Sequence, residues 1–199
     1  MTNTSATGGY LIPFTPAPGE DGSLDQALQP ILAGITGFDP SLVRRKWQEV
    51  SPPTPPANVT WLAFGAIDES ADTNAALVHN PQGDGGLGNL TSYRTEETQI
   101  MASFYGPDCA SYAAGLRDGF GIGQNREAMQ RAGIAFVQNE RLTKVPELRG
   151  EGWVRRVDVV FRIRRTAART YRIRNIIGVT GQVQTDTGVT APIGTLPSC

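Results

Sequence analysis

The sequence predicts an α+β fold: a mostly antiparallel sheet of about six strands with two or three helices packed on one face. Several long segments place apolar residues at every second position, which is typical of strands with one buried face. Shorter segments repeat apolar residues at helical spacing. The chain has 199 residues, of which 39% are hydrophobic and 19% charged, so one domain with a core is expected.

Three segments are expected to be helical. The first covers Ser23–Gly34, which begins on a residue that caps helices well and contains Pro30 as a kink. The second follows Asp108, another typical N-cap residue. The third is shorter, covers Asn125–Arg131 and ends at Gly133. Together they are expected to cover one face of the sheet.

The first strands are expected over four segments: Leu42–Glu49, Trp61–Ile67, Leu90–Tyr105 and Ile134–Asn139. The run Ser51–Pro56 contains four prolines and is expected to be a stiff connector, because proline cannot extend a strand ladder. The polar, glycine-rich segment Asp68–Asn89 is expected to be a long mobile loop, with room for a short strand around Ala76–Val78.

The last long segment is expected to be a β-hairpin with an apolar face and a basic face. Its strands are Trp153–Arg165 and Thr170–Gln184, joined by a turn at Thr166–Arg169. The apolar face begins with Val157, Val159, Phe161 and Ile163, and the basic face carries Arg156, Arg162, Arg164, Arg172 and Arg174. After Asp186 the chain is polar and contains proline and glycine, so we expect a loose tail.

Three explanations of the basic face remain open at this point. The arginines could pair across strands with the acidic neighbours Glu96, Glu97 and Asp158. They could form a subunit interface, where arginine is enriched over lysine. They could line a groove or lumen for nucleic acid, with contacts to phosphates and none that read the base sequence.

No residues that could form a catalytic, cofactor or metal site stand out. The only histidine, His79, lies in the polar segment without a nucleophile nearby. The run Gly83–Gly88 lacks the lysine and hydroxyl residue of a phosphate-binding loop. Cys109 and Cys199 are too far apart in sequence to form a metal-ligand motif. The absence of a secretory signal and of a long apolar run predicts synthesis in the cytoplasm.

Three stretches resemble the neck and tail terminator proteins, also called tail completion proteins, of tailed bacteriophages. They are Val43–Pro56, Ala102–Gly133 and Pro146–Arg165. The second contains Phe-Tyr-Gly-Pro, a helical segment and Gln-Asn-Arg-Glu, and the third contains Trp-Val-Arg-Arg-Val-Asp. The similarity covers about Leu24–Val183. We therefore expect an arm at residues 1–22, a terminator-like domain at residues 23–186 and a tail at residues 187–199.

The resemblance implies a structural virion protein of the neck that has no enzymatic activity and no cofactor. Such a protein would form a hexameric ring that caps the tail tube, ends its polymerisation and joins tail to head. The implied partners are further copies of the chain, the tail tube protein, head-tail connector or neck proteins, and the sheath if the tail is contractile. Genomic DNA would pass through the ring lumen, and no membrane is involved. Assembly would occur in the host cytoplasm.

A ring subunit needs segments that can order against the rings above and below it. The candidate inter-ring arm carries Tyr10, Leu11, Ile12 and Phe14, and plain disorder is its alternative interpretation. Two other functions remain as alternatives to the terminator. One is a different head-tail connector, neck or tail tube component, and the other is a DNA-binding protein without sequence specificity.

Overall fold

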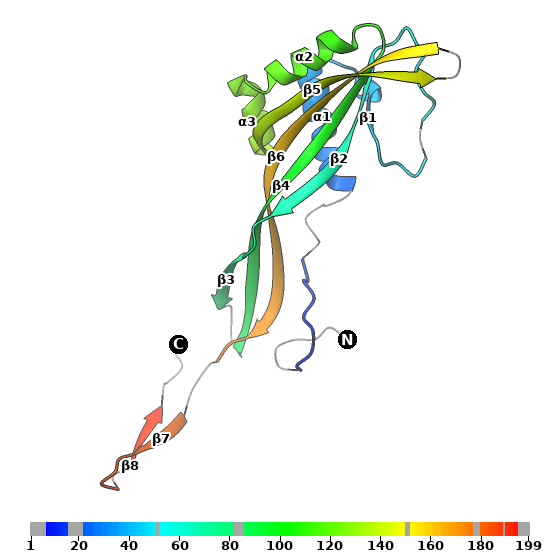
Figure 1. Ribbon diagram of the computed structural model, residues 1–199. Helices are drawn as coiled ribbons and strands as arrows, with labels where there is room; N and C mark the ends of the chain where they lie inside the picture. The colour runs from blue at the N-terminus through cyan, green and yellow to red at the C-terminus, as the bar shows by residue number, and fades with distance from the viewer. Residues whose placement is uncertain are drawn as a thin grey trace. The chain divides into compact units, whose positions relative to one another are not determined.

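The computed structural model describes residues 7–15, 22–50, 52–81, 86–149, 152–176, 180–188 and 190–194. The chain divides into two compact units (Figure 1). Unit 1 comprises residues 1–18, 75–93 and 168–199, and unit 2 comprises residues 19–74 and 94–167. The fold is α+β, with three α-helices and a mostly antiparallel six-stranded sheet among the described residues, as the sequence predicts.

The strand order of the main sheet is β1-β2-β4-β6-β5, and β3 is a further partner of β4. The bounds are Val43–Arg45 for β1, Trp61–Ala71 for β2, Ala76–Pro81 for β3, Leu87–Tyr105 for β4, Ala135–Arg149 for β5 and Gly152–Arg174 for β6. The pairs β2 with β4 and β5 with β6 are antiparallel. The short β1 instead lies parallel to β2, after a 3-10 turn at Pro40–Leu42.

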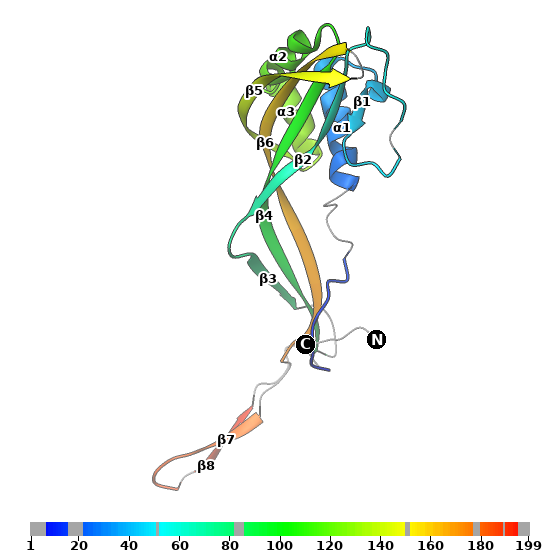
Figure 2. The same cartoon turned by 45° about the vertical axis from the view of Figure 1, so that its right-hand side comes forward.

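The three helices of unit 2 are α1 (Gly22–Thr36), α2 (Cys109–Gly119) and α3 (Gly123–Arg131). They cover one face of the sheet (Figure 2). Helix α1 continues through Pro30 and ends at Thr36, and the following Gly37 has a φ of +73° that suits a glycine that stops a helix. The core between helices and sheet includes Leu28, Leu32, Phe64, Phe104, Phe120 and Phe161, all fully buried.

The predicted alternation of β4 and β6 is confirmed. In β6, Val157, Val159, Phe161 and Ile163 are all buried against the helices. In β4, the same face carries Ile100, Ala102 and Phe104, which are fully buried. These strands could be predicted from the sequence because only one face of each is apolar along most of its length.

The predicted hairpin turn at Thr166–Arg169 is wrong. Strand β6 runs without interruption through these residues, and Ala167 is fully buried. The segment contains no glycine, proline or asparagine that would favour a tight turn. The hairpin partner of β6 is β5, which extends ten residues past the expected end at Asn139. Its Pro146 obscured the strand pattern, but proline is tolerated in an edge strand such as β5.

The expected loop Asp68–Asn89 is largely strand. Strand β2 continues to Ala71, and β3 pairs with the start of β4. The polar residues of these strands are exposed, so no buried face marked them in the sequence. Residues 82–85 of this segment lie outside the described residues. The expected strand Leu42–Glu49 is also shorter, because only Val43–Arg45 pairs with β2.

Unit 1 contains β3, the first part of β4, the last part of β6 and the described part of the N-terminal arm. In the arm, the Phe14 amide donates to the Thr170 carbonyl at 2.9 Å. The Thr91 and Thr170 hydroxyls lie 3.2 Å apart. Unit 1 also holds a separate antiparallel pair, β7 (Thr180–Gln184) and β8 (Thr190–Gly194). The segment expected as a loose tail therefore contains a strand; residues 195–199 lie outside the described residues.

Candidate functional site

The face of the unit 2 sheet opposite the helices, which we call the open face, carries an aromatic pair. Trp61 of β2 and Tyr105 of β4 are opposite each other in the strand register and stack with ring centroids 4.5 Å apart. The Arg44 guanidinium lies 5.4 Å from the Trp61 ring centroid, and that of Arg156 lies 5.7 Å from the Tyr105 centroid. Each ring is therefore held between a second ring and a cation.

Arg156 is locked in place by two carboxylates. Its Nε and Nη2 donate to the two oxygens of Asp158 at 2.9 and 3.0 Å, and its Nη1 donates to Glu147 at 3.1 Å. Burial acts to lower the pKa of Arg156, but its hydrogen bonds to Asp158 and Glu147 and the nearby negative charge together outweigh burial and raise the pKa. The guanidinium therefore stays charged, and its donors are already engaged within the chain.

Lys46 reaches the same region from the segment that follows β1. Its Nζ lies 2.9 Å from the Ser103 hydroxyl. Burial of the ammonium lowers the pKa of Lys46 to about 8, against the opposing attraction of Asp158. Sequence analysis missed Lys46, Trp61 and Tyr105 as a group, because only the pairing of β1 with β2 and of β2 with β4 brings them together.

The other predicted arginines of unit 2 also have partners within the chain. Arg162 Nε donates to Glu140 at 2.9 Å. Arg164 Nε donates to Glu97 at 3.0 Å. Together with Arg156, three of the five arginines predicted for the basic face are paired with carboxylates. These contacts favour the cross-strand pairing explanation for the part of the face that lies in unit 2.

A buried ion pair lies on the helix-covered face, outside the predicted basic face. Arg165 Nε donates to Glu96 at 3.0 Å, and their side chains are only 9% and 4% exposed. Glu96 was expected to pair with the basic face, but its partner is this arginine of the opposite face. A pair so well shielded from solvent fixes the local arrangement of β4 and β6, because neither charge tolerates losing its partner.

The remaining predicted residues lie in unit 1, which exposes its apolar side chains. In the candidate arm, Tyr10 is 93% and Ile12 62% exposed, Phe14 is exposed and Leu11 is half-buried. The Arg172 guanidinium lies 5.0 Å from the Phe14 ring centroid. Arg174 is exposed. Further exposed apolar residues of this unit are Leu77, Val78, Leu87, Tyr93, Ile176 and Val183.

The residues with catalytic or ligand-binding potential are engaged in packing. His79 Nε2 lies 2.6 Å from the Asn175 side-chain oxygen, so the imidazole links β3 to the residue that follows β6. Gly88 allows the same asparagine to approach, since a Cβ there would lie 2.4 Å from its oxygen. Burial raises the pKa of the Cys109 thiol, which disfavours the reactive thiolate. Within the described residues, no group of three or more acidic, histidine or cysteine side chains could hold a metal.

Among the helices of the described segments, none is both long enough and apolar enough to span a bilayer. Comparison with curated proteins found no match to this chain. A family model described as phage neck terminator protein matches residues 22–188, which is most of the sequence. The chain therefore belongs to the phage neck terminator protein family, a family of structural proteins in the neck and tail of the virion.

Proposed function

We propose that the protein forms a hexameric ring in the phage neck that caps the tail tube, ends its polymerisation and joins tail to head. The observation that carries the proposal is the family match over residues 22–188. The protein would act through its surfaces, without a cofactor, since the polar side chains described above are engaged in pairing and packing.

The contrast between covered and uncovered surface supports an assembly role. Unit 2 has a core of its own, whereas unit 1 exposes apolar side chains such as Tyr10, Ile12 and Leu77. Exposed apolar surface of this kind is typical of protein interfaces. We assign the arm residues Tyr10, Leu11, Ile12 and Phe14 to contacts with a neighbouring ring. The neighbours would be the tail tube protein, head-tail connector or neck proteins, and the sheath in a contractile tail.

The ion pairs of the open face reduce the number of arginine donors that could bind the phosphates of passing DNA. Arg156, Arg162 and Arg164 are already engaged by carboxylates, so phosphates would find few free donors there. A surface of balanced charge suits DNA that moves through a lumen, because strong phosphate contacts would retain it. This arrangement argues against a DNA-binding protein as the alternative function.

The deciding experiment is electron microscopy of particles made without this protein. If it terminates tails, its loss gives overlong or headless tails, and the protein supplied in trans restores normal length and joining. Tails of normal length that are attached to heads would contradict the proposal. Copy number in purified virions separates the terminator from a tube subunit, because one ring contains six copies and a tube contains many stacked rings.

A further inference from the structure

The end of the β5–β6 hairpin carries an exposed apolar pair in unit 2. Leu148 and Trp153 are opposite each other in the strand register. They are 57% and 72% exposed. Trp153 lies on the same face of β6 as the buried Val157, but the helices do not cover the strand this far along. Tryptophan is enriched among the residues that dominate binding energy at protein interfaces.

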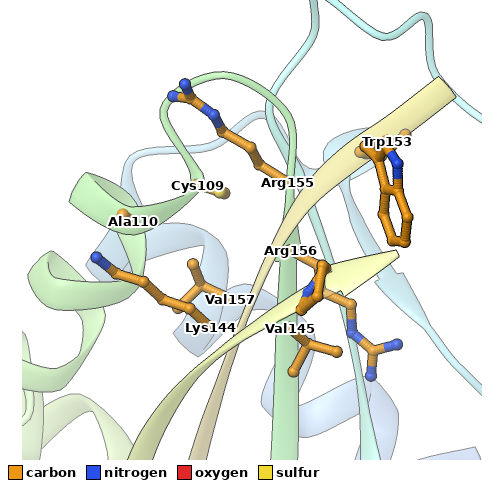
Figure 3. A pocket seen from close by; sticks show the side chains of 10 residues that line it. Cys109, Ala110, Lys144, Val145, Trp153, Arg155, Arg156 and Val157 are labelled. Atoms are coloured by element: carbon orange, nitrogen blue, oxygen red, sulfur yellow. The ribbon is translucent and has the colours of Figure 1, made fainter. Parts of the chain in front are cut away.

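Beside this pair lies a hollow of about 530 Å³ between the hairpin and the start of α2 (Figure 3). Lys144 and Arg155 extend toward the first residues of α2, and Trp153 lies at the opposite side. The described residues that line the hollow include no aspartate or glutamate. We call Lys144, Leu148, Trp153 and Arg155 the hairpin tip. It combines an apolar anchor with positive charge, which fits a partner that is apolar and acidic.

A surface of that chemistry exists on the same chain. In the second half of β2, Ile67, Asp68 and Glu69 are all exposed, and Asp72 follows directly after the strand. β1 pairs only with Leu62–Phe64, so among the described strands none lies on the outer side of this half of β2. We call Ile67, Asp68, Glu69 and Asp72 the acidic edge.

The nearby cations do not cancel this charge. Arg94 donates to the backbone carbonyls of Asp72 and Thr73. Arg164 is paired with Glu97. The acidic edge thus carries three exposed residues with carboxylates, of which Glu69 also accepts a hydrogen bond from the Thr98 hydroxyl.

The sheet order keeps the two surfaces apart within one subunit. The hairpin tip belongs to β5 and β6 at one side of the sheet, and the acidic edge belongs to β2 at the other, with β4 between them. A chain cannot bring its own two surfaces together without breaking the sheet, but two neighbouring copies can. Two different complementary patches on one chain are what a head-to-tail ring requires.

We propose that the ring closes through this contact: the hairpin tip of one subunit docks on the acidic edge of the next. Trp153 and Leu148 pack beside Ile67, while Lys144 and Arg155 face Asp68 and Asp72. Glu69, one position after Asp68, lies on the other face of β2. This inference rests on the proposed ring and names the surfaces that form it. It differs from the inter-ring role of the arm, because both surfaces here lie in unit 2.

The first test measures ring formation by native mass spectrometry and light scattering. Trp153→Ala removes the apolar anchor, and Lys144→Glu with Arg155→Glu reverses the charge of the tip. Each should weaken subunit association by about tenfold or more. Circular dichroism should show the fold intact, because all three side chains are exposed. Arg131→Glu, an exposed position of α3, is the matched control and should leave the ring unchanged.

The second test uses charge exchange between copies. Asp68→Lys with Asp72→Lys should also prevent rings, because the acidic edge then repels the tip. A mixture of the K144E/R155E and D68K/D72K variants should restore them. In an alternating ring of six, one type of boundary joins two reversed surfaces and the other joins two native surfaces, so opposite charges meet at every contact.

The outcomes separate this inference from the proposed function. Rings of the natural protein that tolerate the tip and edge variants would overturn the inference and leave the proposed function standing. Variants that fail alone and fail as a mixture would also overturn it, because the tip would then serve another partner. A natural protein that forms no ring, either purified or in virions, would overturn both.

Discussion

Units 1 and 2 differ in where they keep their apolar residues. All the buried hydrophobic residues among the described segments lie in unit 2, and unit 1 has none. Most charged residues also lie in unit 2, because of the 18 basic and 19 acidic residues only Asp84, Arg169, Arg172, Arg174 and Asp186 lie in unit 1. Unit 2 can therefore fold on its own core, whereas unit 1 has the composition of an interface awaiting a partner.

The largest effect should follow from placing a charge in the core of unit 2. Phe161→Asp buries a carboxylate among the apolar side chains of this core. We expect a loss of about 4 kcal/mol or more in the free energy of unfolding. Ile12→Asp in unit 1 places the same charge at an exposed position and should change stability by about 0.5 kcal/mol or less. Denaturant unfolding of the two variants measures both values, and equal losses would abolish the contrast between the units.

The next largest difference in stability should be between two ion pairs formed by neighbouring arginines of β6. Glu96→Gln removes the charge partner of the buried Arg165 and should destabilise the protein by about 3 kcal/mol. Glu97→Gln removes the partner of Arg164, which is about half exposed, and should have an effect of about 1 kcal/mol or less. Thermal unfolding at neutral pH compares them. A larger effect for Glu97→Gln would mean that burial does not decide the strength of these pairs.

The exposed arm should matter for assembly and hardly at all for folding. Ile12→Asp should leave the unfolding transition unchanged but reduce incorporation into particles about tenfold, if the arm packs its apolar side chains against a neighbouring ring. Ile12→Leu, which keeps the apolar contact, is the matched control. Normal incorporation of the aspartate variant in a complementation assay would show that the arm does not contribute to the contacts between rings in the neck.

The same division explains which parts of the fold could be predicted. The helices and the strands that enclose Phe104 and Phe161 were readable because burial leaves a periodic apolar pattern. The short strand allowed for around Ala76–Val78 is present as β3, but the second half of β5 was missed because both of its faces are largely exposed and leave no apolar pattern. A turn was predicted at Thr166–Arg169, but the segment has no typical turn residues and the strand continues through it. The strand order could not be predicted from the sequence. The contact between Trp61 and Tyr105 depends on that order, so it could not be predicted either.

The smallest effect concerns Lys46 on the open face. Its pKa in the folded protein is about 8, below the ordinary value of 10.5, because burial penalises the ammonium. Between pH 8 and 10.5 the unfolded chain therefore binds more protons than the folded chain, so stability should rise with pH across this range. Lys46→Met removes the titrating group, and the rise should become smaller. Urea unfolding at several pH values measures the two slopes. Identical slopes would mean that the Lys46 ammonium is as well solvated in the folded protein as in the unfolded chain. The open face of unit 2 would then leave Lys46 as accessible to water as the exposed side chains of unit 1 are.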